Sequence, residues 1–215
     1  MTEFFVLYAP PVVGMAILAG FIHARLLEKP TYRGWWGEYK VNFMLRLCLS
    51  SEYSVLPNAI YRGKTKGEST QVDHIVVSRF GLFVLETKSF KGKVLVDPLE
   101  PETWVQLVGR RKYKVQSPLM QNYAHVKAVQ QATGVHAQKI HSYAVMAGDA
   151  DFPYGLPERV YGIWGVVRKI QSYKAPVFTR RHVDDICAAL KRRRVKGGYW
   201  AAQRHVERLR SRGDS

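Results

Sequence analysis

Three charged residues lie in stretches that otherwise have the apolar, β-branched composition of core strands. Asp73 interrupts the run QVDHIVVS, and Glu86 and Lys88 close the run GLFVLETK. A charged group inside a core strand is costly unless it is paired with an opposite charge or bound to a metal ion. Glu86 and Lys88 are two positions apart, so they share one face of their strand. These residues are therefore the first candidates for chemistry.

The turn between the two runs decides whether the three residues meet. If Arg79 and Phe80 form a two-residue turn, Asp73 lies directly across from Glu86, at close cross-strand distance. A bulge at Gly81 would instead shift the pairing by one residue and turn Asp73 to the other face. The first register gathers all three charged groups on one face of a hairpin.

Two facing carboxylates repel each other unless a cation neutralises them. Hard oxygen ligands suit Mg²⁺ or Mn²⁺. A neighbouring ammonium group such as that of Lys88 can hold a water molecule or stabilise the charge that develops on a phosphoryl oxygen. The alternative is a structural ion pair between Lys88 and one of the two acids.

The elements that must position these residues are predicted from hydrophobic periodicity. The chain has 215 residues, of which 47% are hydrophobic, which is enough for one ordinary domain and excludes a disordered or fibrous protein. We expect an α/β domain over residues 37–195, with a mixed β-sheet flanked by helices, and a basic C-terminal helix over residues 196–215. Strands are predicted over 53–60, 71–78, 82–90, 93–96, 104–108, 141–146 and 160–167, and helices from residue 37, over 117–133 and over 179–193.

A stretch without charged residues precedes this domain. Residues 4–22 contain no charge over nineteen positions, and a helix of that length spans about 28 Å, close to the hydrocarbon thickness of a membrane. We predict a membrane anchor within residues 1–27, followed by a juxtamembrane linker over residues 28–36. A cleaved signal peptide and a buried core helix are the alternatives. Because Lys and Arg follow the stretch and none precedes it, the N-terminus is expected outside and the domain in the cytoplasm.

The charge balance favours a partner rich in phosphate. The chain carries 33 Lys and Arg against 17 Asp and Glu, a net charge of +16. Nucleic acid and an anionic membrane surface both match such a field. The cluster at residues 191–194 fits either partner, and it equally fits a solvated helix end that complements the helix dipole. The nearest candidates for phosphate contacts around the hairpin are Arg110, Arg111, Lys112 and Lys114.

Three segments in a fixed order resemble a known family. GWWGEYKVNFML, QVDHIVVSRFGLFVLETKSFKGKV and SPLMQN are similar to the nuclease-related domain (NERD), a branch of the PD-(D/E)XK phosphodiesterase superfamily, over about residues 34–133. The resemblance implies a mixed sheet flanked by helices, with Asp73 and Glu86 as ligands of Mg²⁺ or Mn²⁺ and Lys88 as the catalytic lysine. It also implies that Glu38 completes the metal site and that Gln121 lies near the metal or the scissile phosphate.

Some residues depart from the family pattern or have an ordinary explanation. Val72 stands where the superfamily has Pro, and His125 stands where related nucleases carry Tyr in a Gln-x-x-x-Tyr motif. Glu38 could be a first-turn acid stabilised by the helix dipole, and Gln121 an exposed polar residue of its helix.

The sequence thus predicts a membrane-anchored, divalent-metal-dependent nuclease, with DNA preferred over RNA as the substrate. The charged hairpin and the basic surface together support this reading. Two alternatives remain open at this stage. One is a catalytically inactive tether that binds nucleic acid on the same fold, and the other is a component of a membrane complex whose basic tail holds lipid or a partner protein.

Overall fold

The computed structural model describes residues 30–62 and 69–195. The predicted anchor at residues 4–22 and the predicted basic helix at residues 196–215 lie outside this part of the chain. Among the helices that the structure describes, none is both long and apolar enough to cross a membrane.

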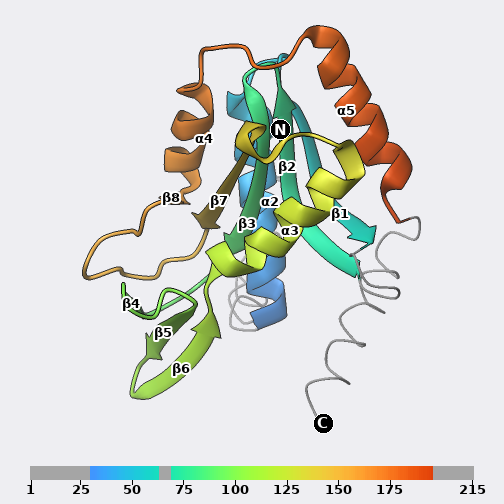
Figure 1. The fold of residues 1–215 in the computed structure, drawn as a ribbon. Helices are drawn as coiled ribbons and strands as arrows, with labels where there is room; N and C mark the ends of the chain where they lie inside the picture. Colours follow the sequence, from blue (N-terminus) through green and yellow to red (C-terminus); the bar gives the residue numbers. More distant parts are fainter. Residues whose placement is uncertain (1–29, 63–68, 196–215) are drawn as a thin grey trace, which may run out of the picture.

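A five-stranded mixed sheet forms the centre of the fold (Figure 1). The first three strands of the sheet pair antiparallel. The other two are parallel additions, since β7 (Ile140–Met146) runs parallel to β3 (Gly81–Lys88) and β8 (Val160–Gly162) runs parallel to β7. β3 therefore lies in the middle, where both of its edges are paired. The strands, in spatial order, are β1 (Ser54–Arg62), β2 (Ser69–Ser78), β3 (Gly81–Lys88), β7 (Ile140–Met146) and β8 (Val160–Gly162).

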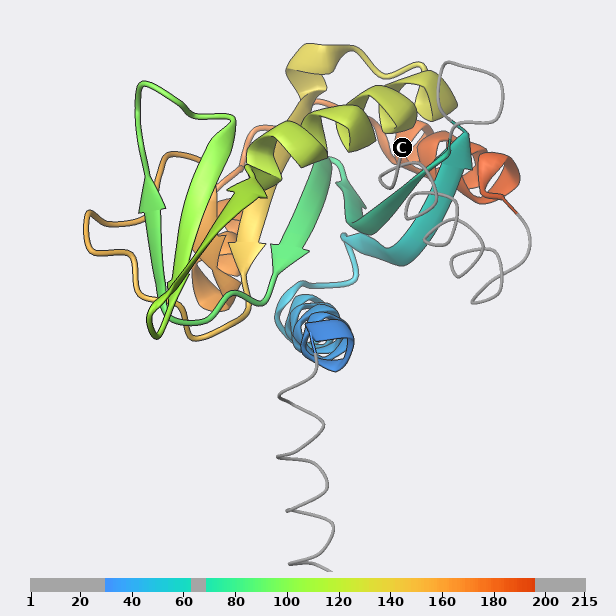
Figure 2. The same ribbon diagram turned by 90° about the horizontal axis from the view of Figure 1, so that it is seen from below.

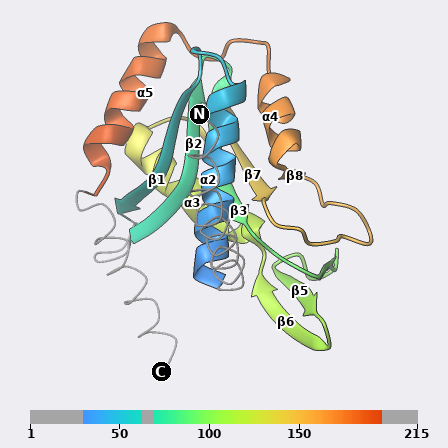
Figure 3. The same ribbon diagram turned by 180° about the vertical axis from the view of Figure 1, so that it is seen from behind.

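Helices cover both faces of this sheet, as Figures 2 and 3 show. Alternate residues of β2 and β3 face opposite sides, so both faces need an apolar cover. On one face, Ile75 and Val84 pack against α3 (Pro118–Thr133) and α5 (Arg180–Arg193). On the other face, Val76 and Leu85 pack against α2 (Pro30–Cys48) and α4 (Ile163–Gln171). The predicted α/β class, a mixed sheet flanked by helices, is confirmed.

Two predicted boundaries are wrong. Helix α2 begins at Pro30, so most of the segment predicted as a linker over residues 28–36 is helical. Proline suits the first turn of a helix, because a backbone N–H at that position has no acceptor within the helix and its absence costs no hydrogen bond. The predicted strand over residues 160–167 ends at Gly162 and continues as α4. Val166, Val167 and Ile170 are buried on one side of α4, with the three- and four-residue spacing of a helix.

A second sheet lies between β3 and α3 in the sequence. It contains β4 (Lys93–Val96), β5 (Thr103–Val108) and β6 (Arg111–Gln116), all antiparallel. Trp104 is buried there with Val94 and packs against the end of the central sheet near Met146. The second sheet therefore stands beside the end of β3 where Glu86 and Lys88 lie (Figure 1).

Candidate functional site

The β2–β3 hairpin has the register that places Asp73 across from Glu86. Ser78 pairs with Gly81, and residues 79 and 80 form the turn. The pairing continues in step to His74 and Leu85, so the next positions, Asp73 and Glu86, are opposite each other. The predicted register is confirmed, and the alternative with a bulge at Gly81 is wrong.

Lys88 is held between the hairpin and helix α3. Its Nζ lies 2.7 Å from Glu86 Oε1 and donates a hydrogen bond of 2.7 Å to Gln121 Oε1. The Glu86 side chain is 2% exposed, whereas that of Lys88 is 24% exposed. The ammonium group is thus fixed by two partners and still reaches solvent. The structure brings together Glu86, Lys88 and Gln121, as the sequence predicted.

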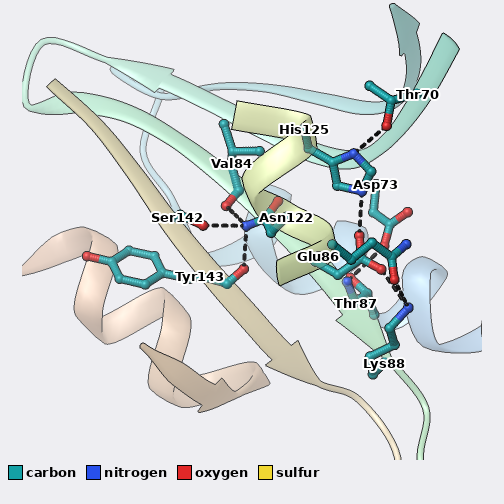
Figure 4. A network of polar contacts seen from close by, with 11 residues as sticks. Thr70, Asp73, Val84, Glu86, Thr87, Lys88, Asn122, His125, Ser142 and Tyr143 are labelled. Atoms are coloured by element: carbon teal, nitrogen blue, oxygen red, sulfur yellow. Dashed lines mark hydrogen bonds and ion pairs between the residues drawn. The ribbon is translucent and has the colours of Figure 1, made fainter. Parts of the chain in front are cut away.

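The second oxygen of Glu86 is bound by a histidine that was not among the predicted site residues. His125 Nε2 donates to Glu86 Oε2 at 2.9 Å, and His125 Nδ1 lies 2.6 Å from the Thr70 hydroxyl (Figure 4). An ionised carboxylate only accepts hydrogen bonds, so the proton of this contact is on Nε2. Gln121 and His125 are four residues apart on one face of α3, and this spacing is the signal that could have found His125.

Asp73 is oriented by the backbone of the neighbouring strand. The Thr87 N–H donates to Asp73 Oδ2 at 2.8 Å. Burial raises the pKa of Asp73 well above its usual 3.8, and the nearby carboxylates of Glu86 and Glu38 raise it further. The Thr87 hydrogen bond and the charge of Lys88 lower this pKa only in part. Asp73 is therefore an acid placed among other acids with too little positive charge to balance them.

Glu38 reaches the same place from helix α2. The preceding residue, Gly37, packs directly against Ser89, whose hydroxyl would have to move to admit a side chain at residue 37, so the helix approaches the end of β3 closely. Burial, together with the negative charge of Glu86, raises the pKa of Glu38 to about 7 against the opposing effect of Lys88. Glu38 thus lines the same cavity as Asp73 and Glu86. Its role in completing a metal site stays a prediction.

Glu86 differs from the other two acids because it has cationic and hydrogen-bonding partners. Burial alone would raise its pKa, but the hydrogen bond from His125 and the charge of Lys88 outweigh burial and lower it. The cluster therefore holds one stably ionised carboxylate, Glu86, and two, Glu38 and Asp73, whose burial favours the protonated form.

A buried asparagine fixes α3 against the sheet next to this cluster. Asn122 is fully buried, and its Nδ2 donates to the Val84 carbonyl at 2.8 Å, the Ser142 hydroxyl at 2.9 Å and the Tyr143 carbonyl at 3.1 Å (Figure 4). These contacts tie α3 to β3 and β7. They set the position of the helix that carries Gln121 and His125.

The acids lie in a cavity of about 870 Å³ that opens between α2, the end of β3 and the second sheet. Glu38, Asp73 and Glu86 form part of its wall together with Lys88 and Gln121. Basic residues and an aromatic side chain line the same cavity, namely Arg33, Lys91, Arg111 and Tyr113. The cavity thus combines carboxylates with cations contributed by separate elements.

Of the four basic residues predicted to contact phosphate, only Arg111 lines this cavity. Arg110 lies in the turn before β6, and Lys112 and Lys114 alternate with Arg111 and Tyr113, so they project from the other face of β6. Tyr113, which the sequence analysis did not select, lines the cavity and is 43% exposed.

The carboxylates do not form a ready-made cage for a metal ion. Within residues 30–62 and 69–195, no three His, Cys, Asp or Glu side chains are placed so that they could hold one ion together. Both Glu86 oxygens are already engaged, by Lys88 and by His125. Any ion at this site would need further ligands from water or substrate.

The comparisons with known proteins place the chain in a family. The chain is 37% identical over 101 residues to an uncharacterized protein of Bacillus anthracis, and the match covers 47% of either protein, so the chain spans about half the length of this curated relative. No solved structure is significantly similar to the chain. The model of the nuclease-related domain (NERD) matches residues 33–147, which include the cluster from Glu38 to His125. The chain belongs to the nuclease-related domain family.

Proposed function

We propose that the protein is a divalent-metal-dependent nuclease that hydrolyses phosphodiester bonds, with DNA as the preferred substrate. One observation carries this proposal. Lys88 Nζ, held by Glu86 and Gln121, lies in an open cavity whose wall also contains Asp73 and Glu38. A cation fixed beside acids can serve phosphoryl chemistry, whereas a purely structural ion pair has no need of an open cavity.

The residues present fit Mg²⁺ or Mn²⁺ in their chemistry. Mg²⁺ keeps several water ligands and is commonly bound through one or two carboxylates together with substrate phosphates, so a cage of three protein ligands is not required. Asp73 and Glu86 would hold the ion, with Glu38 in support. Thr87 Oγ1 and Ser89 Oγ, from two residues that line the cavity, are buried without a hydrogen-bond partner in the part of the chain that the structure describes. When bound, the ion supplies positive charge that polarises a phosphoryl oxygen.

The side chains around the acids have separate tasks in this proposal. Lys88 places its ammonium group where negative charge grows on the phosphoryl oxygens. Gln121 accepts from Lys88 and so fixes the direction of that group. His125 keeps one oxygen of Glu86 in place. Gln121 and His125 are thus positioning residues for Lys88 and Glu86.

The basic rim supports nucleic acid as the substrate. Lys91 and Arg111 line the cavity without a carboxylate partner among the described residues, so they are available for backbone phosphates. Tyr113 offers an exposed aromatic face on which a base can stack. The proposed binding mode positions a strand through its backbone and does not depend on its base sequence.

The test is cleavage by the full chain. Single-stranded DNA, duplex DNA and RNA are incubated with Mg²⁺, with Mn²⁺ and with a chelator, beside Lys88→Ala and Asp73→Asn. Lys112→Ala is the control, because it removes the same charge from the other face of β6. We expect cleavage that requires metal, is lost in both site variants and is retained in the control. Cleavage that survives in Lys88→Ala would overturn the proposal.

An inactive tether on the same fold is the second candidate. The engagement of both Glu86 oxygens by Lys88 and His125 favours it, since a carboxylate with two partners can be structural. This candidate predicts binding of nucleic acid without cleavage, and unchanged binding in Lys88→Ala. The cleavage experiment, repeated with binding as a second readout, separates the two candidates.

We also propose, from the sequence alone, that residues 4–22 anchor the protein in a membrane with the domain on the cytoplasmic side. Extraction of membranes with alkaline carbonate tests this proposal. The full chain is expected in the pellet and a variant lacking residues 1–22 in the supernatant. Recovery of the full chain in the supernatant would contradict an anchor.

A further inference from the structure

A second pocket, separate from the acidic cavity, is lined by arginines. It has a volume of about 630 Å³ and lies between the end of β1, the last turns of α3 and the end of α5. Four arginine residues line it, together with one tyrosine and residues of α3. The arginines are Arg62, Arg192, Arg193 and Arg194.

Two of the arginines are held in place, but none is neutralised within the described residues. Arg194 Nη2 donates to the Asn58 carbonyl at 2.6 Å, and Arg193 Nη1 donates to the Gln131 carbonyl at 3.3 Å. Carbonyl oxygens orient a guanidinium group but carry no net charge. No carboxylate in residues 30–62 or 69–195 pairs with any of the four arginines. Among the described residues, the positive charge of the pocket is therefore uncompensated.

Tyr61 provides an independent sign of a missing ligand. It lines the same pocket, is 1% exposed, and its hydroxyl is buried without a hydrogen-bond partner in the part of the chain that the structure describes. A buried hydroxyl without a partner is costly, so nearly all such groups in proteins are satisfied. An acceptor brought by a ligand would satisfy it. Four cationic arginines and one neutral hydroxyl donor together favour an oxyanion as the ligand.

We propose that this pocket binds a phosphate group of the nucleic-acid strand, at a distance from the acidic cavity. The inference rests on the proposed function, because it takes nucleic acid as the substrate. Gln121 and Gln131 mark the two sites along α3. Ten residues of helix separate them by about 15 Å along the axis, which corresponds to roughly four or five nucleotides at 3.4 Å per nucleotide.

The pocket also adjoins the contacts that hold Glu86. Tyr61 pairs with Thr70 across β1 and β2, and the Thr70 hydroxyl contacts His125. His125 in turn donates to Glu86. The pocket is thus linked to Glu86 through the strand pairing of Tyr61 with Thr70 and the side-chain contacts of Thr70 and His125.

The experiment measures binding of the full chain to a fluorescent single-stranded DNA of twelve nucleotides, with a chelator present so that no cleavage occurs. The variant Arg192→Gln/Arg193→Gln removes two charges from the pocket. Its matched control, Arg180→Gln/Arg181→Gln, removes two charges from the exposed first turn of the same helix. We expect at least about tenfold weaker binding for the pocket variant and a salt slope smaller by about 0.7, as for one lost phosphate contact on a single strand. The control is expected to bind like the wild type.

Tyr61→Phe keeps the charge and the ring and removes only the hydroxyl. We expect binding weaker by about twofold to tenfold, with an unchanged or higher Tm, because an unpaired buried group is removed. A merely structural role for Tyr61 would change the Tm without changing the affinity. A third measurement compares the Tm with and without inorganic phosphate. It distinguishes a small phosphate compound from a nucleic-acid strand as the ligand of the pocket.

Three results would overturn the inference. If the pocket variant and its control bind DNA equally well, the pocket is not a phosphate site for the strand, while the proposed nuclease still stands on the Lys88 and Asp73 variants. If inorganic phosphate stabilises only the wild-type pocket and DNA affinity is unchanged, the ligand is a small phosphate compound and the assignment to a strand is wrong. If even the wild type fails to bind the single-stranded DNA, this inference fails, while the proposed function is decided separately by the cleavage experiment with Lys88→Ala and Asp73→Asn.

Discussion

His125 Nε2 donates a hydrogen bond of 2.9 Å to Glu86 Oε2, so the buried acid of β3 is held from helix α3 as well as by Lys88 on its own strand. The geometry of the hairpin acids therefore depends on a helix that follows in the sequence only after an entire second sheet. Any change that moves α3 is expected to move Glu86 as well.

Replacing His125 is expected to lower activity through Glu86. In His125→Phe, the carboxylate loses a hydrogen bond that lowers its pKa, so its pKa rises and the acidic limb of the pH–rate profile moves to higher pH. We expect a loss in kcat of about 10- to 100-fold, in the range found for partners that orient ligand side chains. His125→Tyr restores a donor at the position where related nucleases carry Tyr, and it is expected to recover part of the activity. An unshifted pH profile in His125→Phe would contradict this role.

Glu38 makes stability depend on pH in an unusual direction for a carboxylate. Its pKa rises from 4.5 to about 7 on folding, so the folded state binds the proton more tightly than the unfolded chain. The resulting stability is complete below about pH 4.5 and is lost as the pH rises through 7. Asp73 acts in the same direction, whereas Glu86 acts in the opposite direction, and only at more acidic pH.

Urea unfolding at pH 5 and pH 8 measures this effect. Between pH 5 and pH 8, we expect the free energy of unfolding of the metal-free wild type to fall by roughly 1–2 kcal/mol more than that of Glu38→Gln. This figure is discounted for the partial exposure of Glu38. Mg²⁺ is expected to stabilise the protein more at pH 8 than at pH 5, because it competes with protons for the acids. Equal pH dependence in both proteins would show that Glu38 does not titrate as described.

The two faces of β6 are expected to differ in nucleic-acid binding. Arg111 and Tyr113 line the cavity, whereas Lys112 and Lys114 project from the other face. Tyr113→Ala is expected to weaken binding of single-stranded DNA by about 1–3 kcal/mol, the usual worth of a stacked base. Fluorescence anisotropy would compare Arg111→Gln with Lys112→Gln at equal net charge. If Lys112→Gln weakens binding as much as Arg111→Gln, the cavity is not the binding face.

Asn122 is expected to matter for stability more than any exposed polar residue of α3. Asn122→Ala leaves the carbonyls of Val84 and Tyr143 without the Asn122 amide and opens a small cavity. We expect a loss of about 2–4 kcal/mol in the free energy of unfolding. Gln131→Ala, at an exposed position of the same helix, is expected to change it by less than about 0.5 kcal/mol. Equal losses in the two variants, measured by urea unfolding, would mean that Asn122 does not anchor the helix.

The hairpin could be predicted because its structure is determined by residues that are close together in the sequence. The length of the turn fixes the register, and the alternation of side chains then places Asp73 opposite Glu86. Helix α3 was predicted within a residue for a similar reason. Pro118 suits its first turn, and Gly134 takes the left-handed conformation, with a φ of 71°, that ends the helix.

The remaining parts depend on contacts between distant segments. The run from Val160 to Val167 is apolar throughout, so its period could not separate a strand from a helix. Strand propensity also does not reveal that β4, β5 and β6 form their own sheet. The contact between Thr70 and His125 follows from how α3 packs across β2, which no local pattern encodes. For the same reason, the basic run from Arg110 to Lys114 did not reveal which of its side chains face the cavity.

The parallel pairing of β3 with β7 also sets the order in which this protein can fold. Leu82 pairs with Ile140, so the whole second sheet and helix α3 must be synthesised before the central strand gains its second neighbour. Pairings between such distant segments form slowly, and until then one edge of β3 remains open to other strands. The hairpin with Asp73, Glu86 and Lys88 therefore leaves the ribosome well before Gln121 and His125 can dock on it. The growing chain is therefore expected to lack the complete group of Glu86, Lys88, Gln121 and His125 until α3 and β7 have been synthesised.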